Sequence, residues 1–344
     1  MRRLFAVYLL VAATVVAASW AEPHRGVITA GARDVSALQL EEQIPVKGVS
    51  GRIDHFSADV KRKRLFVSAL GNNSLEVIDT FAARVVHTID ALSEPQGAVY
   101  LAELDKLYVA NAGDGKVRVF DGATYTLRKT IEFDVDPDNL RYDPTTKLVF
   151  VGFGEEDGGI AMIDPAIDER VGTVLKTGGH PESFQVEAKG THVFVNVPDA
   201  DNVVESFDRT TGSVSRWPLR SLKGNYAMAL NEDDHRLYTV TRKVPMMVVL
   251  DSTSGREVAR LPAAGECDDV YFDAVRKRIY AIGAQGFISV FQQNDPDHYT
   301  LVDNVPSKIG ARTGFFYSRR DRLYVGVPAQ GNDPAQVWTY EAED

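Results

Sequence analysis

Short apolar segments alternate with short polar turns along nearly the whole chain. Within this alternation, one phrase centred on an aromatic residue recurs seven times, at intervals of 41 to 45 residues. Its copies are Leu65-Phe66-Val67, Leu107-Tyr108-Val109, Leu148-Val149-Phe150-Val151, Val193-Phe194-Val195, Leu237-Tyr238-Thr239, Ile279-Tyr280-Ala281 and Leu323-Tyr324-Val325. A repeat of this length predicts a radial array with one four-stranded sheet in each repeat.

The second repeat displays the predicted sheet most clearly. Four segments rich in apolar residues indicate strands, given from the inner to the outer: 97–101, 106–110, 116–121 and 126–133. In five repeats the third strand ends in an aspartate that we expect to cap the next turn by accepting backbone hydrogen bonds: Asp79, Asp121, Asp164, Asp208 and Asp251. Because apolar residues do not recur at helical spacing, the predicted fold class is all-β.

The two ends of the repeat array complement each other. The seventh repeat stops soon after its third strand, whereas the segment 38–45 before the first repeat reads as an outer strand without a partner. We expect this segment to pair with the C-terminal strands, because closing the ring protects exposed sheet edges. The prediction is a seven-bladed β-propeller of four-stranded blades over residues 35–344, closed by an N-terminal outer strand in the last blade.

The first residues have the pattern of a secretory signal peptide. Arg2 and Arg3 precede an apolar run over 4–18, and small residues stand at Ser19 and Ala21. We therefore predict a signal peptide over 1–21, a mobile lead over 22–34 and a periplasmic or secreted protein. The apolar run is short for a membrane span, so no transmembrane segment is expected after signal removal.

Charge and cysteine content restrict the possible partners. The formal net charge is −10, and loss of Arg2 and Arg3 with the signal peptide leaves −12. An acidic protein of this kind is not expected to bind nucleic acid in general. Cys267 is the only cysteine, which excludes an intrachain disulfide, and we expect it to be a buried apolar residue.

The phrase Leu107-Tyr108-Val109-Ala110-Asn111 resembles the motif of the YVTN-repeat β-propeller family, and the likeness covers nearly the whole mature chain. The resemblance implies an exported propeller. The motif residues of this family are structural, so the resemblance implies no catalytic residues and no defined activity.

Five carboxylates are predicted to meet where the inner strands begin, at the mouth of the central channel. Counting back from each repeated phrase gives Asp54, Asp138, Glu182, Asp268 and Asp269. Carboxylates at close range repel one another unless a cation lies between them. Oxygen donors suit Ca²⁺ or Mg²⁺, so we expect one of these two ions if the carboxylates bind a cofactor. The alternative is that Arg52, Arg312 and water neutralise the ring of carboxylates.

Other polar residues are predicted at the same mouth. His55 and His180 are candidate general bases beside the carboxylates, with a hydrogen-bonded channel histidine as the alternative for each. Arg52, Gln96, Asn139, Tyr226 and Arg312 are candidate ligand-binding residues, and Gln96 and Tyr226 can equally plug the channel.

Charge is predicted to differ between the two faces of the ring. Acidic residues gather in turns on the face of the channel mouth, here called the top. The opposite turns carry a basic patch: Lys61, Arg62, Lys63, Arg276, Lys277, Arg278, Arg319 and Arg320. This patch can dock an anionic surface or an acidic protein, and the alternative is ordinary solvated turn residues.

The sequence favours a monomeric binding scaffold that recognises a cation, a small ligand or a protein partner at its acidic top face. The alternative is a divalent-metal-assisted hydrolase of lactones or esters. In that case an ion at the mouth carboxylates polarises a carbonyl and activates water, with His55 as base.

Overall fold

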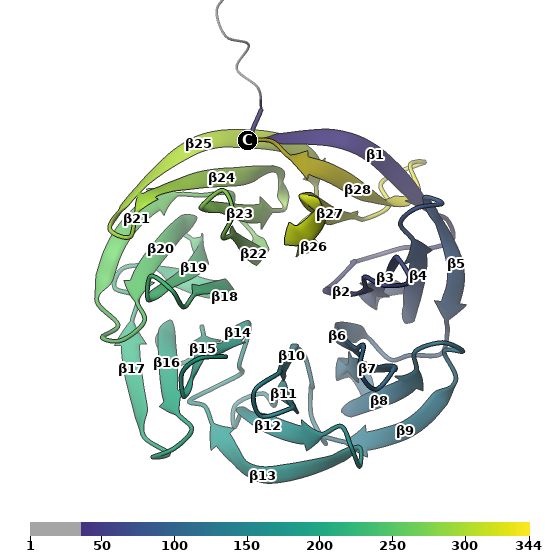
Figure 1. Cartoon of the computed structure of the whole chain (residues 1–344), viewed down its shortest axis with the longest axis horizontal. Helices are drawn as coiled ribbons and strands as arrows, with labels where there is room; N and C mark the ends of the chain where they lie inside the picture. The colour runs from purple at the N-terminus through teal and green to yellow at the C-terminus, as the bar shows by residue number, and fades with distance from the viewer. Residues whose placement is uncertain (1–35) are drawn as a thin grey trace, which may run out of the picture. The chain divides into compact units, whose positions relative to one another are not determined.

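Seven antiparallel sheets, each of four strands, stand around a common axis (Figure 1). The computed structural model describes residues 36–344, and the predicted signal peptide and lead lie outside the described residues. The predicted seven-bladed propeller is confirmed. Within each blade the strands follow one another from the axis to the rim, except in the seventh blade.

The first four blades follow the chain in order. Blade 1 contains β2 (Phe56–Asp59), β3 (Arg64–Ala69), β4 (Ser74–Asp79) and β5 (Arg84–Ile89). Blade 2 contains β6 (Pro95–Leu101), β7 (Lys106–Asn111), β8 (Lys116–Asp121) and β9 (Leu127–Glu132). Blade 3 contains β10 (Leu140–Asp143), β11 (Leu148–Phe153), β12 (Gly159–Asp164) and β13 (Glu169–Lys176). Blade 4 contains β14 (Phe184–Val186), β15 (His192–Val197), β16 (Val203–Asp208) and β17 (Val214–Pro218).

The last three blades complete the ring. Blade 5 contains β18 (Lys223–Asn231), β19 (Arg236–Lys243), β20 (Met246–Asp251) and β21 (Glu257–Pro262). Blade 6 contains β22 (Cys267–Asp273), β23 (Arg278–Gly283), β24 (Gln285–Asp295) and β25 (His298–Ile309). Blade 7 contains β26 (Gly314–Tyr317), β27 (Arg322–Val327), β28 (Ala335–Ala342) and β1 (Leu38–Val46). Short 3₁₀ turns occupy η1 (Leu70–Asn72), η2 (Ala112–Asp114) and η3 (Ser318–Arg320).

The hydrophobic core lies between neighbouring blades. The aromatic residue of each repeated phrase is buried on the second strand: Phe66, Tyr108, Phe150, Phe194, Tyr238, Tyr280 and Tyr324. Several of these rings pack against an inner-strand aromatic of the next blade, and Tyr238 stacks on Phe272 with 5.5 Å between ring centroids. The repeat is therefore a packing unit that needs its neighbours to bury its apolar faces.

The N-terminal strand closes the ring, as predicted. β1 lies antiparallel to β28, with Leu38 opposite Ala342 and Val46 opposite Ala335 (Figure 1). The side chains of Leu38 and Ile44 are buried, whereas Leu40 of the same strand is 39% exposed. Two ends of the chain about three hundred residues apart therefore share one sheet.

Aspartates cap the turns that leave the third strands, also as predicted. Oδ1 of Asp121 accepts hydrogen bonds from the backbone N–H groups of Ala123 and Thr124, at 2.9 and 2.7 Å. The same bonds recur after Asp79 and Asp251. The recurrent aspartate is therefore a structural residue of the turn.

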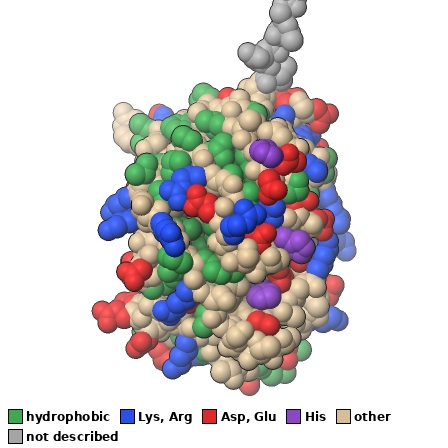
Figure 2. Space-filling model, turned by 90° about the vertical axis from the view of Figure 1, so that its left-hand side faces the viewer, with side chains coloured by type: hydrophobic (Ala, Val, Ile, Leu, Met, Phe, Trp, Pro, Cys, Tyr) green, Lys and Arg blue, Asp and Glu red, His purple; other side chains and the backbone are tan. Residues whose placement is uncertain are grey.

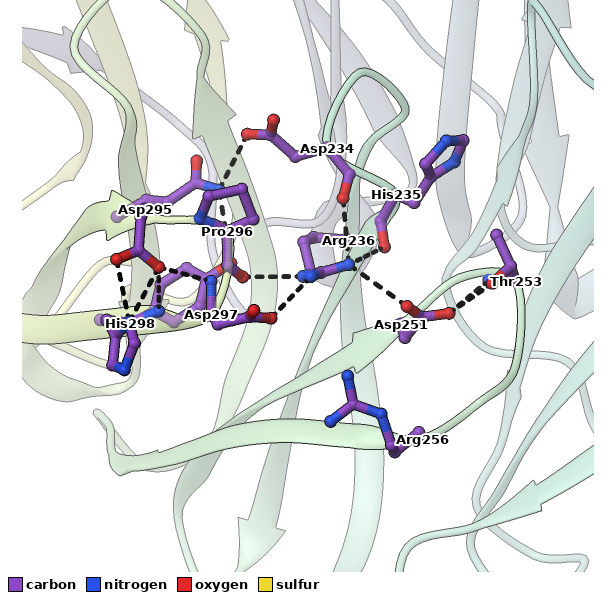
Figure 3. A network of polar contacts seen from close by, with 12 residues as sticks. Asp234, His235, Arg236, Asp251, Thr253, Arg256, Asp295, Pro296, Asp297 and His298 are labelled. Atoms are coloured by element: carbon purple, nitrogen blue, oxygen red, sulfur yellow. Dashed lines mark hydrogen bonds and ion pairs between the residues drawn. The ribbon is translucent and has the colours of Figure 1, made fainter.

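The outer wall combines polar and apolar side chains, and ion pairs join its blades. Figure 2 shows the wall around β17, β21 and β25, where acidic and basic side chains are interspersed with hydrophobic ones. Below β19, Arg236 donates to the Pro296 carbonyl and contacts Asp297 Oδ1, both at 2.7 Å (Figure 3). It also contacts Asp251 Oδ2 at 3.4 Å, so one guanidinium connects blades 5 and 6.

Within residues 36–344, helices long and apolar enough to cross a membrane are absent.

Candidate functional site

The predicted mouth carboxylates come together on the top face, at or just before the inner strands. Asp54, Asp138, Asp268 and Asp269 are nearly fully buried, with exposed fractions of 6% or less, while Glu182 is half-buried. Charged oxygen atoms are costly to bury unless a cation or a donor compensates each of them. The structure divides four of these carboxylates into two groups with different compensation, and the fifth, Asp269, pairs with His55.

The first group is neutralised by arginine. Arg52 Nη2 lies 3.0 Å from Asp54 Oδ2. Oδ2 of Asp268 lies 3.7 Å from both Arg52 Nη2 and Arg312 Nε, and its Oδ1 contacts the guanidinium of Arg242. Burial nevertheless raises the pKa of Asp54 above its usual range. For Asp54 and Asp268, these contacts match the alternative in which arginines, rather than a metal, compensate the carboxylates.

A β-bulge places two consecutive aspartates of blade 6 at the mouth. The pairing of β22 with β23 shifts between Cys267 and Asp269, and the backbone N–H groups of Asp268 and Asp269 both donate to the Arg312 carbonyl, at 3.3 and 3.1 Å. The bulge lets both side chains stay in the ring of polar groups rather than on opposite faces of the blade.

Cys267 beside them is buried, and burial raises its thiol pKa, as expected for an apolar role.

His55 crosses the axis just below the mouth. Its Nδ1 lies 3.1 Å from Asp269 Oδ1, and its Nε2 lies 3.2 Å from the side-chain amide of Asn139 and 3.6 Å from Asp54 Oδ1. Burial opposes the charged imidazolium, but the charges of Asp269 and Asp54 and the hydrogen bond to Asp269 outweigh it and raise the pKa to about 9. When Nε2 also carries a proton, it needs the Asn139 oxygen, which in the orientation shown accepts from Arg141. A protonated, hydrogen-bonded His55 is not available as a general base at neutral pH.

The second group is a cluster of Asp138, His180 and Glu182. One candidate ligand atom from each residue lies within 4.8 Å of the others. Nδ1 of His180 hydrogen-bonds to the Gly154 carbonyl, while Nε2 lies 3.8 Å from Asp138 Oδ2. The other oxygen, Asp138 Oδ1, is buried without a hydrogen-bond partner among the described residues. A backbone carbonyl that holds Nδ1–H fixes the tautomer that leaves Nε2 available to a metal.

Burial and neighbouring charges determine how many protons the residues of this cluster carry. Burial raises the pKa of Glu182 to about 8, reinforced by the charge of Asp138. Burial opposes charge on His180 too, but its hydrogen bond to Asp138 and the charges of Glu182 and Asp138 raise its pKa to about 10. In the absence of a metal, protons therefore compensate this cluster. A divalent ion would replace those protons.

The donor set differs in chemistry from the all-oxygen set expected from the sequence. His180, expected to be a base, contributes an imidazole nitrogen to the same cluster as two carboxylates. Nitrogen and carboxylate donors together suit Zn²⁺ or Mn²⁺ better than Ca²⁺ or Mg²⁺. Three protein ligands also leave coordination positions open for water or a ligand.

The predicted ligand-binding residues mostly support charged neighbours. Nε2 of Gln96 donates to Asp136 Oδ1 at 3.1 Å. The guanidinium carbon of Arg242 lies 3.4 Å from the centre of the Tyr226 ring, close enough for a cation–π contact. Beside them the top face is hollowed by a cavity of about 540 Å³ whose lining includes Asp136, Glu155 and His180. The cluster therefore borders an acidic cavity.

Much of the predicted basic patch is engaged within the protein. Arg62 contacts Asp105 Oδ2 at 2.7 Å, and Arg276 contacts Asp321 Oδ1 at 2.6 Å. Arg278 donates to the Glu343 carbonyl. These guanidiniums hold turns of neighbouring blades together.

The rest of the patch is more open to solvent. Lys63 Nζ lies 4.2 Å from the centre of the Phe81 ring. Within residues 36–344, the patch members without an ion pair are Lys61, Lys63, Lys277, Arg278, Arg319 and Arg320. Of these, Lys61, Lys277, Arg319 and Arg320 are exposed, so they form the part of the patch that a partner can reach.

Several residues of the mouth were not predicted from the sequence. Arg242 ends the second strand of blade 5 and reaches the axis, and Asp136 and Gly154 hold His180 from blade 3. The position of Arg242 after Leu237-Tyr238-Thr239 places it at the top of that strand, which is a usable signal. The contact of Gly154 with His180 has no counterpart in the sequence pattern.

Comparison with known proteins identifies the fold. No family model and no curated protein matches the chain. Among solved structures, hydrazine synthase of Kuenenia stuttgartiensis aligns with a TM-score of 0.71 and 16% identity, covering 81% of this chain and 95% of that one. A chain of the mitotic checkpoint complex aligns with a TM-score of 0.73 and 14% identity, covering 96% of this chain and 98% of that one. The WD40 repeats of RRP9 align with a TM-score of 0.75 and 11% identity, covering 89% of this chain and 100% of that one. These likenesses show a propeller with WD40-like neighbours.

Proposed function

We propose that this propeller is an exported, monomeric binding scaffold of the YVTN-repeat type, whose channel mouth binds a divalent metal ion through Asp138, His180 and Glu182. Propellers commonly present one face for recognition, and this face carries the most concentrated set of unusual charges. A periplasmic or secreted location follows from the signal-like residues 1–21.

One observation carries the metal assignment: the orientation of His180. The Gly154 carbonyl engages Nδ1, so Nε2 faces Asp138 and Glu182. The buried, unpartnered Oδ1 of Asp138 adds an acceptor that an ion would satisfy. An ordinary surface carboxylate pair would have neither feature.

The ligand that accompanies the ion is expected to be anionic. Positive charge from Arg52 and Arg242 acts on Glu182 from the other side of the mouth. These guanidiniums, with Arg312, can receive a carboxylate or phosphate whose other end reaches the ion. Gln96 lines the same hollow as Arg52, and Tyr226 packs against Arg242.

Calorimetry and thermal unfolding of the chelated mature protein test the metal site. We expect Zn²⁺ or Mn²⁺ to bind with one-to-one stoichiometry and to raise Tm by several degrees, because binding to the native state alone stabilises it. His180→Gln should abolish both effects. His298→Gln is the matched control, since His298 lies exposed on the outer β25. Equal responses in both variants, or no response in the native protein, would reject the site.

A metal-assisted hydrolase of lactones or esters is the second candidate, favoured by the open positions of the cluster beside guanidiniums. The ion would polarise a carbonyl and activate water. His55 is committed to Asp269 and Asn139, and Glu182 would ligate the ion, so the proton of the ion-bound water would pass to solvent. Turnover of aryl esters or lactones that is lost on chelation and in Glu182→Gln would support this candidate. Turnover that survives both would exclude this cluster as the catalytic site.

A further inference from the structure

A second chamber lies below the mouth, along the axis of the propeller. His55 and Asp269 form its upper end, and the inner strands surround a cavity of about 420 Å³. Most of its lining is apolar, including Val99, Leu230, Phe272 and Phe315. A cavity of this volume falls within the range of small-molecule sites, which is about 300–1,000 Å³.

One guanidinium stands in this apolar lining without a carboxylate partner. Within residues 36–344, Arg141 of β10 forms no ion pair. Its Nη1 donates to Asn139 Oδ1 at 3.2 Å and to the Leu140 carbonyl at 2.9 Å, and its Nη2 makes only a long contact of 3.4 Å with Ser183 Oγ. Its Nε–H has no partner among the described residues. The edge formed by Nε and Nη2 is the one that carboxylates bind in a bidentate manner.

The other charged groups of the chamber compensate each other. His55 faces Asp269 at 3.1 Å, and the second oxygen of Asp269 accepts a hydrogen bond from the Gly314 N–H at 2.9 Å. Arg141 therefore leaves the lining with one positive charge in excess. A charge in apolar surroundings attracts an opposite charge more strongly than it would in water.

We infer that this chamber binds a small monocarboxylic acid, with its carboxylate on Arg141 and an aromatic or branched apolar body against the inner-strand side chains. A single guanidinium matches one carboxylate better than a multiply charged phosphate, which usually engages several cations. The apolar walls stabilise the complex further, because they bury the apolar surface of the ligand body. This site is distinct from the metal cluster, because none of the three cluster residues lines the chamber.

Calorimetry with phenylacetate and its neutral analogue phenylacetamide tests the inference. We expect the native protein to bind phenylacetate, and Arg141→Gln to weaken this binding by about tenfold or more, a loss of about 1.4 kcal/mol. Binding of phenylacetamide, which is weaker from the start, should not change. Arg256→Gln is the control, since Arg256 is exposed on the outer wall. His180→Gln should also leave phenylacetate binding intact, which separates this chamber from the metal site.

Two further measurements guard against a trivial loss of folding. Val99→Trp fills the chamber without changing its charge, and we expect it to abolish binding while Arg141 remains. Crystals grown with 4-bromophenylacetate should show the anomalous signal of bromine inside the chamber. A bromine position elsewhere, unchanged binding in a folded Arg141→Gln variant, or no phenylacetate binding by the native protein up to about 10 mM would overturn the inference.

Discussion

Nδ1 of His55 lies 3.1 Å from Oδ1 of Asp269, and this contact joins the first blade to the sixth across the axis of the propeller. On its other side the same imidazole reaches Asn139 of the third-blade loop at 3.2 Å. Three parts of the ring therefore meet at one side chain. The imidazole lines the mostly apolar chamber, whose lining contains none of Asp138, His180 and Glu182.

The protonation of His55 predicts a loss of stability at alkaline pH. Its pKa is raised in the folded protein from 6.5 to about 9, so the imidazolium stabilises the fold fully below pH 6.5. That contribution, about 3 kcal/mol at most, is lost as pH rises through 9. We expect Tm of the native protein to fall between these pH values. His55→Asn should be less stable at pH 6 and should show a shallower fall.

Exposed histidine provides the control for this pH effect. His298→Asn should reproduce the pH dependence of the native protein, because His298 lies on the outer wall away from the axis. A fall of Tm that is identical in His55→Asn and the native protein would contradict a charged His55.

Ring closure predicts unequal effects for two leucines of one strand. Leu38 of β1 is 1% exposed and Leu40 is 39% exposed. Leu38→Ala should lower the free energy of unfolding by about 2–5 kcal/mol, because it leaves a cavity in the core between blades 6 and 7. Leu40→Ala should change it by less than about 1 kcal/mol. Urea unfolding measures both, and equal small effects would mean that β1 contributes little to the closure.

Arg236 predicts a stabilising connection between blades 5 and 6. Its side chain is 9% exposed and its guanidinium serves Pro296, Asp297 and Asp251 (Figure 3). Arg236→Gln should lower the free energy of unfolding by about 2 kcal/mol. It leaves partly buried acceptors without a hydrogen-bond donor, while the exposed Asp297 can hydrogen-bond to water instead. Arg256→Gln, in the same view but exposed, should be neutral. A neutral Arg236→Gln by urea unfolding would rule out this role.

The proposed metal site predicts proton release when an ion binds. His180 has a pKa of about 10 and Glu182 of about 8, so both carry protons at neutral pH without an ion. Binding of Zn²⁺ has to displace them, and its apparent affinity should rise from about pH 6 to pH 8. Calorimetry in buffers of different ionisation enthalpy counts the protons. Binding without proton release would place the ion away from His180 and Glu182.

The fold was largely predictable because its signals are local and repeated. The phrase around Tyr108 recurs once per blade, and each copy buries its aromatic residue in the same way. The turn-capping role of Asp121 depends only on the next three residues. Closure by 38–45 followed from counting strands. The position of Asp54, Asp138 and Glu182 just before the inner strands was likewise readable, because equivalent positions in every repeat point to one axis.

The chemistry at that axis depended on contacts between blades. The pairing of Arg242 with Asp268 rests on a bulge in blade 6, and the orientation of His180 rests on a carbonyl of blade 3. Likewise, the sequence suggested an open basic patch, while Arg276 proved to be engaged with Asp321 of the next blade. The sequence by itself determined the number of blades, the order of strands and the five carboxylates near the axis. Only the tertiary structure decided which charges compensate each other, because charge compensation depends on distances of a few ångströms between residues brought together by ring closure.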